Sequence, residues 1–163
     1  MGKIFKLDEL LEILAVQREA HKRIVFTNGC FDIMHAGHVG YLSAARRQGD
    51  LLVVGLNSDL SVRVIKGTTR PIVAEGMRAQ VLEALACVDY ITLFDDPDPL
   101  KLIVALKPDV LVKGADWAES RIIGAREVRA WGGDVVRVPL VPGISTSEIV
   151  RRILEMNAAS RAG

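Results

Sequence analysis

Short apolar runs that alternate with helical patterns limit most strongly how this chain can fold. The runs cover residues 23–27, 51–56, 90–94, 110–112 and 135–138, and a helical pattern follows each of them. Strands that are apolar on both faces belong inside a parallel sheet, and parallel strands need crossover connections. We therefore predict a Rossmann-like, doubly wound α/β fold with five parallel strands in the order 3-2-1-4-5.

The helical segments complete this prediction. They are expected at residues 7–21, 39–48, 57–65, 75–86, 100–106, 122–131 and 145–156. The sequence shows no internal repeat and no linker, so residues 1–163 are predicted to form a single domain. Residues 1–22 would be an N-terminal helical extension, and residues 158–163 a loose tail.

Composition and charge exclude several classes of function. Half of the residues are apolar, a quarter are charged, and the formal net charge is +1, which gives no reason to expect binding to nucleic acid or to a membrane. We find no leader peptide and no apolar run of membrane-spanning length, so we expect a cytoplasmic protein. Cys30 and Cys87 lie far apart, which favours a reducing compartment without a disulfide or a zinc site.

The loop after the first strand carries the clearest functional pattern, F-T-N-G-C-F-D-I-M-H-A-G-H at positions 26–38. His35 and His38 stand three residues apart and share one face of a helical turn. Gly37 between them has no side chain to keep a phosphate from the backbone. Because anions bind where a strand of a parallel sheet leads into a helix N-terminus, we predict a phosphate site with two imidazole donors rather than two cap residues.

Four loops should meet at this edge of the sheet, at residues 27–38, 57–70, 113–117 and 142–147. In the second loop, Lys66 and Arg70 flank G-T-T and suit a polyphosphate, although a solvated surface loop has the same composition. Arg78, in the following helix, either reaches the same phosphates or is an exposed helix arginine.

The two remaining loops and Asp32 add polar groups. Lys113 ends a buried strand and should point into the cleft. Asp116 and Trp117 can hold a sugar hydroxyl and cover a ring, or Trp117 only packs. Asp32 either orients a substrate hydroxyl or accepts backbone N–H bonds.

Ser145 and Glu148 fit a capping box, and the helix N-terminus there can also bind a nucleotide phosphate. The sequence shows no Walker A motif, no zinc-ligand spacing, no Ser-His-Asp set and no G-x-G-x-x-G after the first strand. It also has no cluster of carboxylates that suggests a metal cage. Any Mg²⁺ would therefore be bound mainly through the phosphates of the substrate.

The motif at residues 35–38 resembles the H-x-G-H signature of the nucleotidyltransferase superfamily, which includes cytidylyltransferases and class I aminoacyl-tRNA synthetases. From Ile24 to Ile153 the chain resembles the nucleotidyltransferase half of the ADP-heptose synthase family. The matching motifs also include G-L-N-S-D-L-S-V, K-G-T-T-R-P-I, L-V-K-G-A-D-W and G-I-S-T-S-E-I-V-R-R-I, so that all four loops are covered.

This resemblance implies an adenylyltransferase that converts ATP and D-glycero-β-D-manno-heptose 1-phosphate to ADP-heptose and pyrophosphate, for the inner core of lipopolysaccharide. Mg²⁺ would accompany ATP, and a separate heptose-7-phosphate kinase would supply the sugar phosphate. We also expect a homodimer. The residues alone do not separate adenine from cytosine. An enzyme like glycerol-3-phosphate cytidylyltransferase or pantetheine-phosphate adenylyltransferase therefore stays open, as does a non-catalytic nucleotide-binding module.

The predicted site falls into three groups. The predicted catalytic residues, which by resemblance hold the ATP phosphates, are His35, His38 and Lys66. The predicted nucleotide-binding residues are Thr27, Asn28, Gly29, Cys30, Phe31, Gly37, His38, Lys113, Gly114, Ser145, Thr146 and Ser147. The predicted substrate-binding residues are Asp32, Asn57, Arg70, Arg78, Asp116 and Trp117; by resemblance Asp32 and Lys113 would meet the sugar phosphate. No metal ligand from the protein is predicted.

Overall fold

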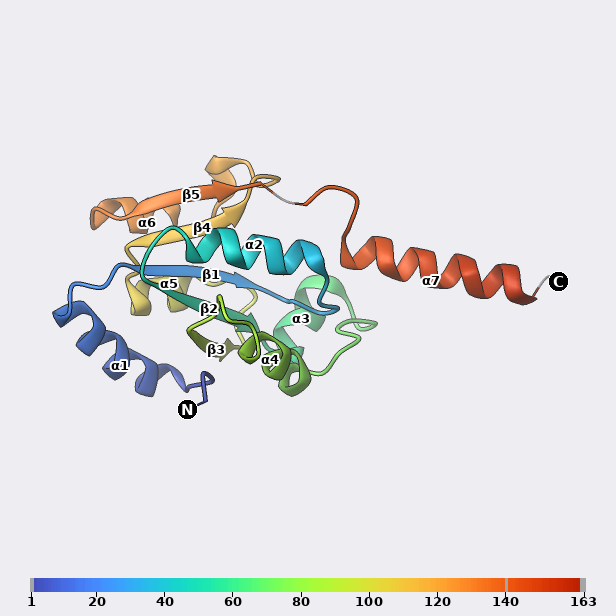
Figure 1. The fold of residues 1–163 in the computed structure, drawn as a ribbon, viewed down its shortest axis with the longest axis horizontal. Helices are drawn as coiled ribbons and strands as arrows, with labels where there is room; N and C mark the ends of the chain where they lie inside the picture. The colour runs from blue at the N-terminus through green and yellow to red at the C-terminus, as the bar shows by residue number, and fades with distance from the viewer. Residues whose placement is uncertain (1, 140, 162–163) are drawn as a thin grey trace.

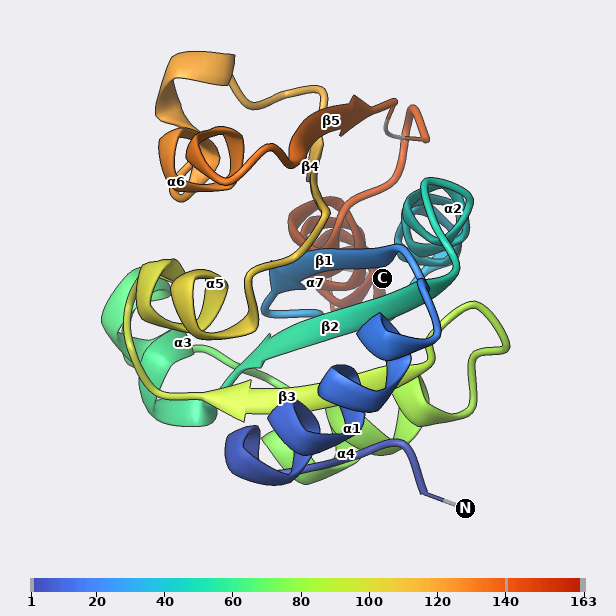
Figure 2. The ribbon, with the colours of Figure 1, turned by 90° about the vertical axis from the view of Figure 1, so that its left-hand side faces the viewer.

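The computed structural model describes residues 2–139 and 141–161. Its centre is a five-stranded parallel sheet in the order β3-β2-β1-β4-β5, which confirms the predicted topology (Figure 2). The strands are β1 (Ile24–Gly29), β2 (Leu51–Asn57), β3 (Tyr90–Phe94), β4 (Val110–Gly114) and β5 (Asp134–Val138). The two strands that flank β1 are β2 and β4, so the sequence order reverses beside β1, and the carboxyl end of this strand opens a crevice.

Helices cover both faces of the sheet (Figures 1 and 2). They are α1 (Leu7–Glu19), α2 (Ala36–Arg46), α3 (Asp59–Lys66), α4 (Glu75–Glu83), α5 (Leu100–Leu106), α6 (Ala125–Ala130) and α7 (Thr146–Arg161), with a 3₁₀ turn, η1, at Glu119–Arg121. One apolar cluster joins α2 and α4 to the sheet, and a second joins α1, α5 and α6 to its other face. Successive residues of β1 alternate between them: Val25 belongs to the first cluster, and Ile24 and Phe26 to the second.

The N-terminal segment is part of this core. Leu10 and Leu14 of α1 are fully buried in the second cluster. Before α1, the chain runs beside the edge strand β3, where the N–H of Phe5 donates to the carbonyl of Ile91 at 2.9 Å. The carbonyl of Lys3 accepts from the N–H of Ile91 at 2.8 Å. The predicted extension therefore covers an edge and a face of the sheet.

Several helix ends differ from the prediction for local reasons. The predicted 39–48 helix begins three residues earlier, at Ala36, because His35 is its N-cap. The predicted 122–131 helix begins only at Ala125, since Gly124 takes a left-handed conformation with φ of 86°. The last helix continues to Arg161, so residues 158–161 are helical rather than a loose tail, and 162–163 lie outside the described residues. No helix in the described ranges is both long and apolar enough to cross a membrane.

Candidate active site

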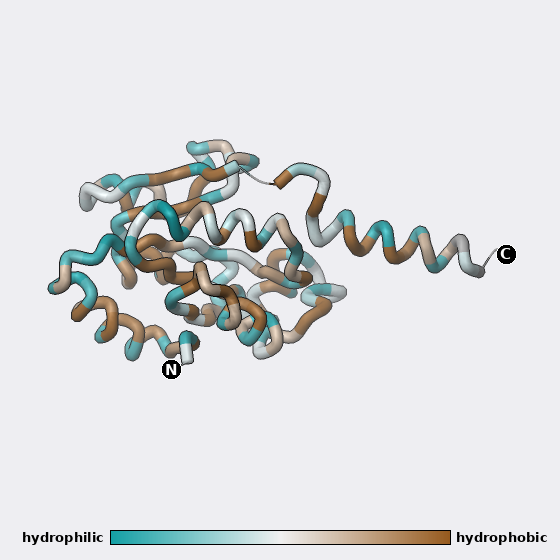
Figure 3. Tube along the Cα trace, in the orientation of Figure 1, coloured by the Kyte–Doolittle hydropathy of each residue, from teal (hydrophilic) through white to brown (hydrophobic). Residues whose placement is uncertain are grey.

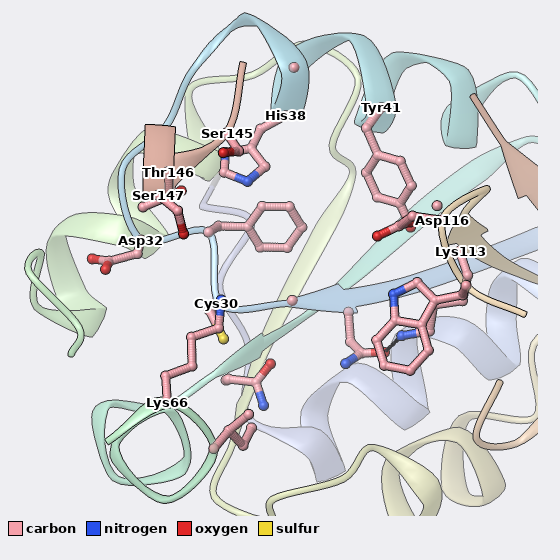
Figure 4. Close-up of a pocket in the computed structure, with 18 of the residues that line it drawn as sticks. Cys30, Asp32, His38, Tyr41, Lys66, Lys113, Asp116, Ser145, Thr146 and Ser147 are labelled. Carbon is pink, nitrogen blue, oxygen red and sulfur yellow. Dashed lines mark hydrogen bonds between the residues drawn. The ribbon is translucent and has the colours of Figure 1, made fainter. Parts of the chain in front are cut away.

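A pocket of about 500 Å³ lies at the carboxyl end of the sheet, where the four predicted loops meet (Figure 4). Eighteen of the predicted site residues line it: Asn28, Gly29, Cys30, Phe31, Asp32, His35, Gly37, His38, Asn57, Lys66, Arg70, Lys113, Gly114, Asp116, Trp117, Ser145, Thr146 and Ser147. Its size falls in the range of small-molecule sites, about 300–1,000 Å³.

The two histidines form a stacked pair at the start of α2. The centroids of the rings of His35 and His38 lie 3.8 Å apart, with an angle of 20° between the planes. His35 is the N-cap, and its Nδ1 accepts from the backbone N–H of His38 at 3.4 Å. A Cβ at Gly37 would stand 2.9 Å from the His35 ring. Glycine is therefore needed here to leave room for His35 as well as for a ligand.

The surroundings of His38 keep its imidazole neutral. Burial, followed by the charges of His35 and Lys66, lowers the pKa of His38 to about 4, although the backbone of Ile33 partly opposes this shift. The ring of Phe31 packs against it edge to face, with centroids 5.3 Å apart. Within residues 2–139 and 141–161, Nδ1 of His38 is buried and has no hydrogen-bond partner. An unpaired buried nitrogen in a pocket is ready to bond to a ligand.

The second predicted loop carries the basic residues Lys66 and Arg70, and we call it the basic loop. Lys66 is the last residue of α3, and its side chain extends toward Cys30 (Figure 4). Gly67 then turns the chain away with φ of 92°. The loop returns to the first loop at Asp32, where Nη1 of Arg70 lies 2.6 Å from Oδ2 of the carboxylate. This ion pair is part of the pocket wall.

Asp32 holds the basic loop in place. Its Oδ1 accepts the backbone N–H of Ile72 at 2.8 Å and that of Val73 at 2.9 Å, while Oδ2 bonds to Arg70. Of the two roles that the sequence left open, the structure shows the second, acceptance of backbone N–H bonds. Its contact with a sugar phosphate stays a prediction.

Arg78 and Thr27 do not line the pocket, in contrast to the prediction. Arg78 is fully buried, and its guanidinium donates to the carbonyls of Cys30, Asn57 and Val73 and to the carboxylate of Asp59. It is thus neither a phosphate contact nor an exposed helix residue, because four groups from separate segments use its donors.

Thr27 is fully buried, and its hydroxyl contacts two neighbouring groups. Its Oγ1 lies 2.6 Å from the hydroxyl of Tyr41 and donates to the carbonyl of Val112 at 3.1 Å. Tyr41 does line the pocket, and the sequence analysis missed it. It follows His38 by three residues on the same helix, so the i, i+3 rule that paired the histidines also identifies it. Burial raises the pKa of Tyr41 to about 12, so its hydroxyl stays protonated.

The ammonium group of Lys113 lies in the pocket wall, next to Asn28. Lys113 is in β4 and points into the pocket as predicted, where its Nζ donates to Oδ1 of Asn28. Burial lowers the pKa of Lys113 to about 8. Asp116 and Trp117 follow β4 at the mouth of the pocket, and Trp117 is 47% exposed. A half-exposed ring is free to stack on a ligand.

The start of α7 closes the remaining side of the pocket. Oγ of Ser145 accepts the N–H of Glu148 at 3.1 Å, as predicted for an N-cap. The carboxylate of Glu148 pairs with Arg151, so one half of the predicted capping box is formed. Cys30 also lines the pocket, and burial raises the pKa of its thiol, which suits the predicted role of a small loop residue rather than a nucleophile.

Within residues 2–139 and 141–161, the protein groups form no metal cage. Among the residues that the structure describes, no group of three or more histidine, cysteine or acidic side chains is placed to hold a metal ion. Asp32 is already paired with Arg70.

The fold and the site together define a nucleotidyltransferase. A parallel sheet presents, at one edge, a helix N-terminus, a histidine pair and two lysines around one pocket, and such donors stabilise a phosphate during its transfer. A model of the cytidylyltransferase-like family matches residues 26–152, and the chain belongs to this family.

Comparisons with individual proteins agree with this family. The bifunctional protein HldE of Syntrophotalea carbinolica is 50% identical over 154 residues, which are 94% of this chain and 31% of that protein. HldE of Koribacter versatilis is 53% identical over 151 residues, 93% of this chain and 31% of that protein. The chain thus spans about a third of the length of these relatives.

Two solved structures share the fold. The lipopolysaccharide core biosynthesis protein from Thermoplasma volcanium has a TM-score of 0.61 and 30% identity, over 74% of this chain and 97% of that chain. Pantothenate synthetase from Thermus thermophilus has a TM-score of 0.58 and 18% identity, over 86% of this chain and 62% of that chain. The second likeness concerns the fold alone.

Proposed function

We propose that this chain transfers the adenylyl group of ATP to D-glycero-β-D-manno-heptose 1-phosphate, giving ADP-heptose and pyrophosphate. The main support is the pocket itself, which is lined by Lys66, Lys113 and a neutral His38 whose Nδ1 has no partner among the described residues. The likeness to HldE proteins over nearly the whole chain supports the choice of substrates. The reaction would occur in the cytoplasm, with the sugar phosphate supplied by a separate kinase, and ADP-heptose would serve lipopolysaccharide synthesis.

The reaction needs little acid–base chemistry from the protein. An oxygen of the sugar phosphate attacks the α-phosphorus of ATP, and the bond from this phosphorus to the bridging oxygen breaks, so that pyrophosphate leaves with the electron pair. The nucleophile is already largely ionised at neutral pH, because the second pKa of a phosphate is about 6. What the site must supply is stabilisation of charge on the transferred and leaving phosphates.

The residues of the chain divide this task. His38 would donate a hydrogen bond to the phosphates, and His35, stacked on it, orients its ring. Lys66 would neutralise the leaving pyrophosphate, and Lys113 would hold the sugar phosphate. Mg²⁺ on the ATP phosphates would supply further neutralising charge. Ser145, Thr146 and Ser147, at the N-terminus of α7, would contact the nucleotide.

The deciding experiment measures pyrophosphate release with a panel of substrates. The protein is incubated with Mg²⁺, with ATP or CTP, and with heptose 1-phosphate, glycerol 3-phosphate or phosphopantetheine. We expect release only with ATP and heptose 1-phosphate. Release with CTP and glycerol 3-phosphate, or with phosphopantetheine, would overturn the heptose assignment. Binding of nucleotide without any release would point to a non-catalytic module.

A further inference from the structure

The parallel sheet opens at its centre, between β1 and β4. The pairing of these two strands, both fully described, ends at Phe26 and Leu111 after two residue pairs. On their outer sides the same strands stay paired farther along, β1 as far as Gly29 and β4 as far as Gly114. Both glycines line the pocket. The pocket therefore lies where β1 and β4 separate, and we call this opening the central split.

Three oxygen atoms bridge the central split just beyond the last residue pair. Oγ1 of Thr27, in β1, lies 2.6 Å from the hydroxyl of Tyr41, in α2. Each of these hydroxyls also donates to the carbonyl of Val112, in β4, at 3.1 Å. All three residues are buried, and they lie among apolar residues of the sheet and of α2, which are brown in Figure 3. Hydrogen bonds thus join β1, α2 and β4 away from water, where they are strongest.

The bond made by Tyr41 connects the two elements that carry the proposed phosphate contacts. His38 lies in the first turn of α2, three residues before Tyr41. Lys113 directly follows Val112 in β4. In Figure 4 the ring of Tyr41 points from α2 toward the side of the pocket that carries Lys113 and Asp116. Of the two bridging hydroxyls, that of Tyr41 is the one that comes from the helix, so it is this bond that ties the helix to β4.

We propose that Tyr41 is a positioning residue, whose hydroxyl holds the helix that carries His38 at a fixed place relative to Lys113. This inference rests on the proposed function, which assigns the ATP phosphates to His38 and the sugar phosphate to Lys113. In-line attack needs the reacting atoms about 3–3.5 Å apart, and a displacement of about 1 Å can cost about a hundredfold in rate. A bond between the two supporting elements therefore bears on the rate of transfer more than on the binding of either substrate.

The variant Tyr41→Phe tests this role, because it removes the hydroxyl and keeps the ring that packs in the first apolar cluster. The carbonyl of Val112 keeps Thr27 as a donor, so the fold should persist, as circular dichroism can verify. We expect kcat at pH 7 to fall about tenfold, while KM for ATP and KM for the sugar phosphate each change less than about threefold. Each substrate keeps its own contacts, and only the position of one relative to the other changes.

The other tyrosine of the chain provides the matched control. Tyr90 lies in β3 and does not line the pocket, and its ring packs edge to face on Phe5. Tyr90→Phe removes the same hydroxyl group from a place that is remote from the central split. We expect kcat and both KM values of Tyr90→Phe to match the wild type.

A measurement without substrates separates the role of Tyr41 from the proposed function. The pKa of Lys113 is lowered mainly by burial, and the charge of Cys30 opposes this shift. Loss of the Tyr41 hydroxyl should loosen the end of β4 and admit water, so the pKa of Lys113 should rise by at least about half a pH unit. Titration of isotope-labelled lysine followed by NMR measures this value, and Lys113→Met assigns the signal. Tyr90→Phe should leave the value unchanged.

The two measurements distinguish the possible failures. If pyrophosphate is released only with an acceptor other than heptose 1-phosphate, the proposed function is wrong, and kcat of Tyr41→Phe with that acceptor still decides the role of Tyr41. If no acceptor supports release, the proposed function is wrong, and the pKa of Lys113 decides whether Tyr41 fixes β4. An unchanged kcat in Tyr41→Phe, a loss confined to KM, an equal loss in Tyr90→Phe, or an unshifted pKa of Lys113 would each overturn the role of Tyr41.

Discussion

A single imidazole, that of His38, has the surroundings expected of a phosphate donor. Its ring is half-buried against His35 and Phe31, and its Nδ1 finds no partner among the described residues. We predict that His38→Ala lowers kcat at least about a hundredfold, since one donor at a developing charge is worth this much. The free energy of unfolding should change by less than about 1 kcal/mol, because His38 lies in the pocket wall and outside both apolar clusters. Pyrophosphate release and urea unfolding measure both; an active variant, or an unfolded one, would contradict the assignment.

The charge of Lys113 should make substrate binding depend on pH. Burial lowers its pKa from 10.5 to about 8, so the amine is charged at pH 7 and loses its proton as the pH rises past 8. If Lys113 holds the sugar phosphate, KM for this substrate should rise up to tenfold per pH unit above pH 8. In Lys113→Met, this rise of KM with pH should be absent. The variant should also resist urea better at pH 7, because a buried charge is removed. Lys101→Met, at an exposed site, is the control. A KM that stays flat to pH 10 would exclude the contact.

At the scale of elements, Asp32 ties the loop before α2 to the loop before α4. Asp32→Asn removes the charge opposite Arg70 and weakens acceptance from the N–H groups of Ile72 and Val73. We predict a loss of about 3–5 kcal/mol in the free energy of unfolding, as for other buried pairs that lose one partner. Amide hydrogen exchange of Ile72 and Val73 should accelerate, and KM for ATP should rise because Lys66 is held less firmly.

The exposed pair of Lys101 and Asp96 provides the control for this experiment. Asp96→Asn should cost less than about 1 kcal/mol, since exposed ion pairs contribute little. If the amides of Ile72 and Val73 exchange at the wild-type rate in the Asp32→Asn variant, then Asp32 does not hold the basic loop, whatever the activity of the variant.

The same elements show what a sequence can reveal. Apolar runs such as β2 and β3 predicted the strands, because burial on both faces leaves a continuous apolar pattern. The pocket residues at strand ends could be predicted from the topology, because the loops that follow parallel strands meet at one edge of the sheet. Arg78 could not be placed, since its partners include carbonyls of residues as distant as Cys30, and no periodicity reports such contacts. The early start of α2 depends likewise on His35, an uncommon N-cap residue.

The molecule as a whole depends on a helix that adds nothing to the site. Helix α1 lies at the end of the body opposite to the start of α7 (Figure 1). Its Leu14 is nevertheless fully buried in the second apolar cluster. We predict that Leu14→Ala lowers the free energy of unfolding by about 2–4 kcal/mol, the usual cost of a cavity in a packed core. Val16→Ala, at a position that is 61% exposed, should cost less than about 0.5 kcal/mol. Urea unfolding measures both, and kcat at 25 °C should stay within about twofold of the wild type, because α1 stabilises the sheet without touching its carboxyl edge. A Leu14→Ala variant as stable as Val16→Ala would show that α1 is an appendage after all.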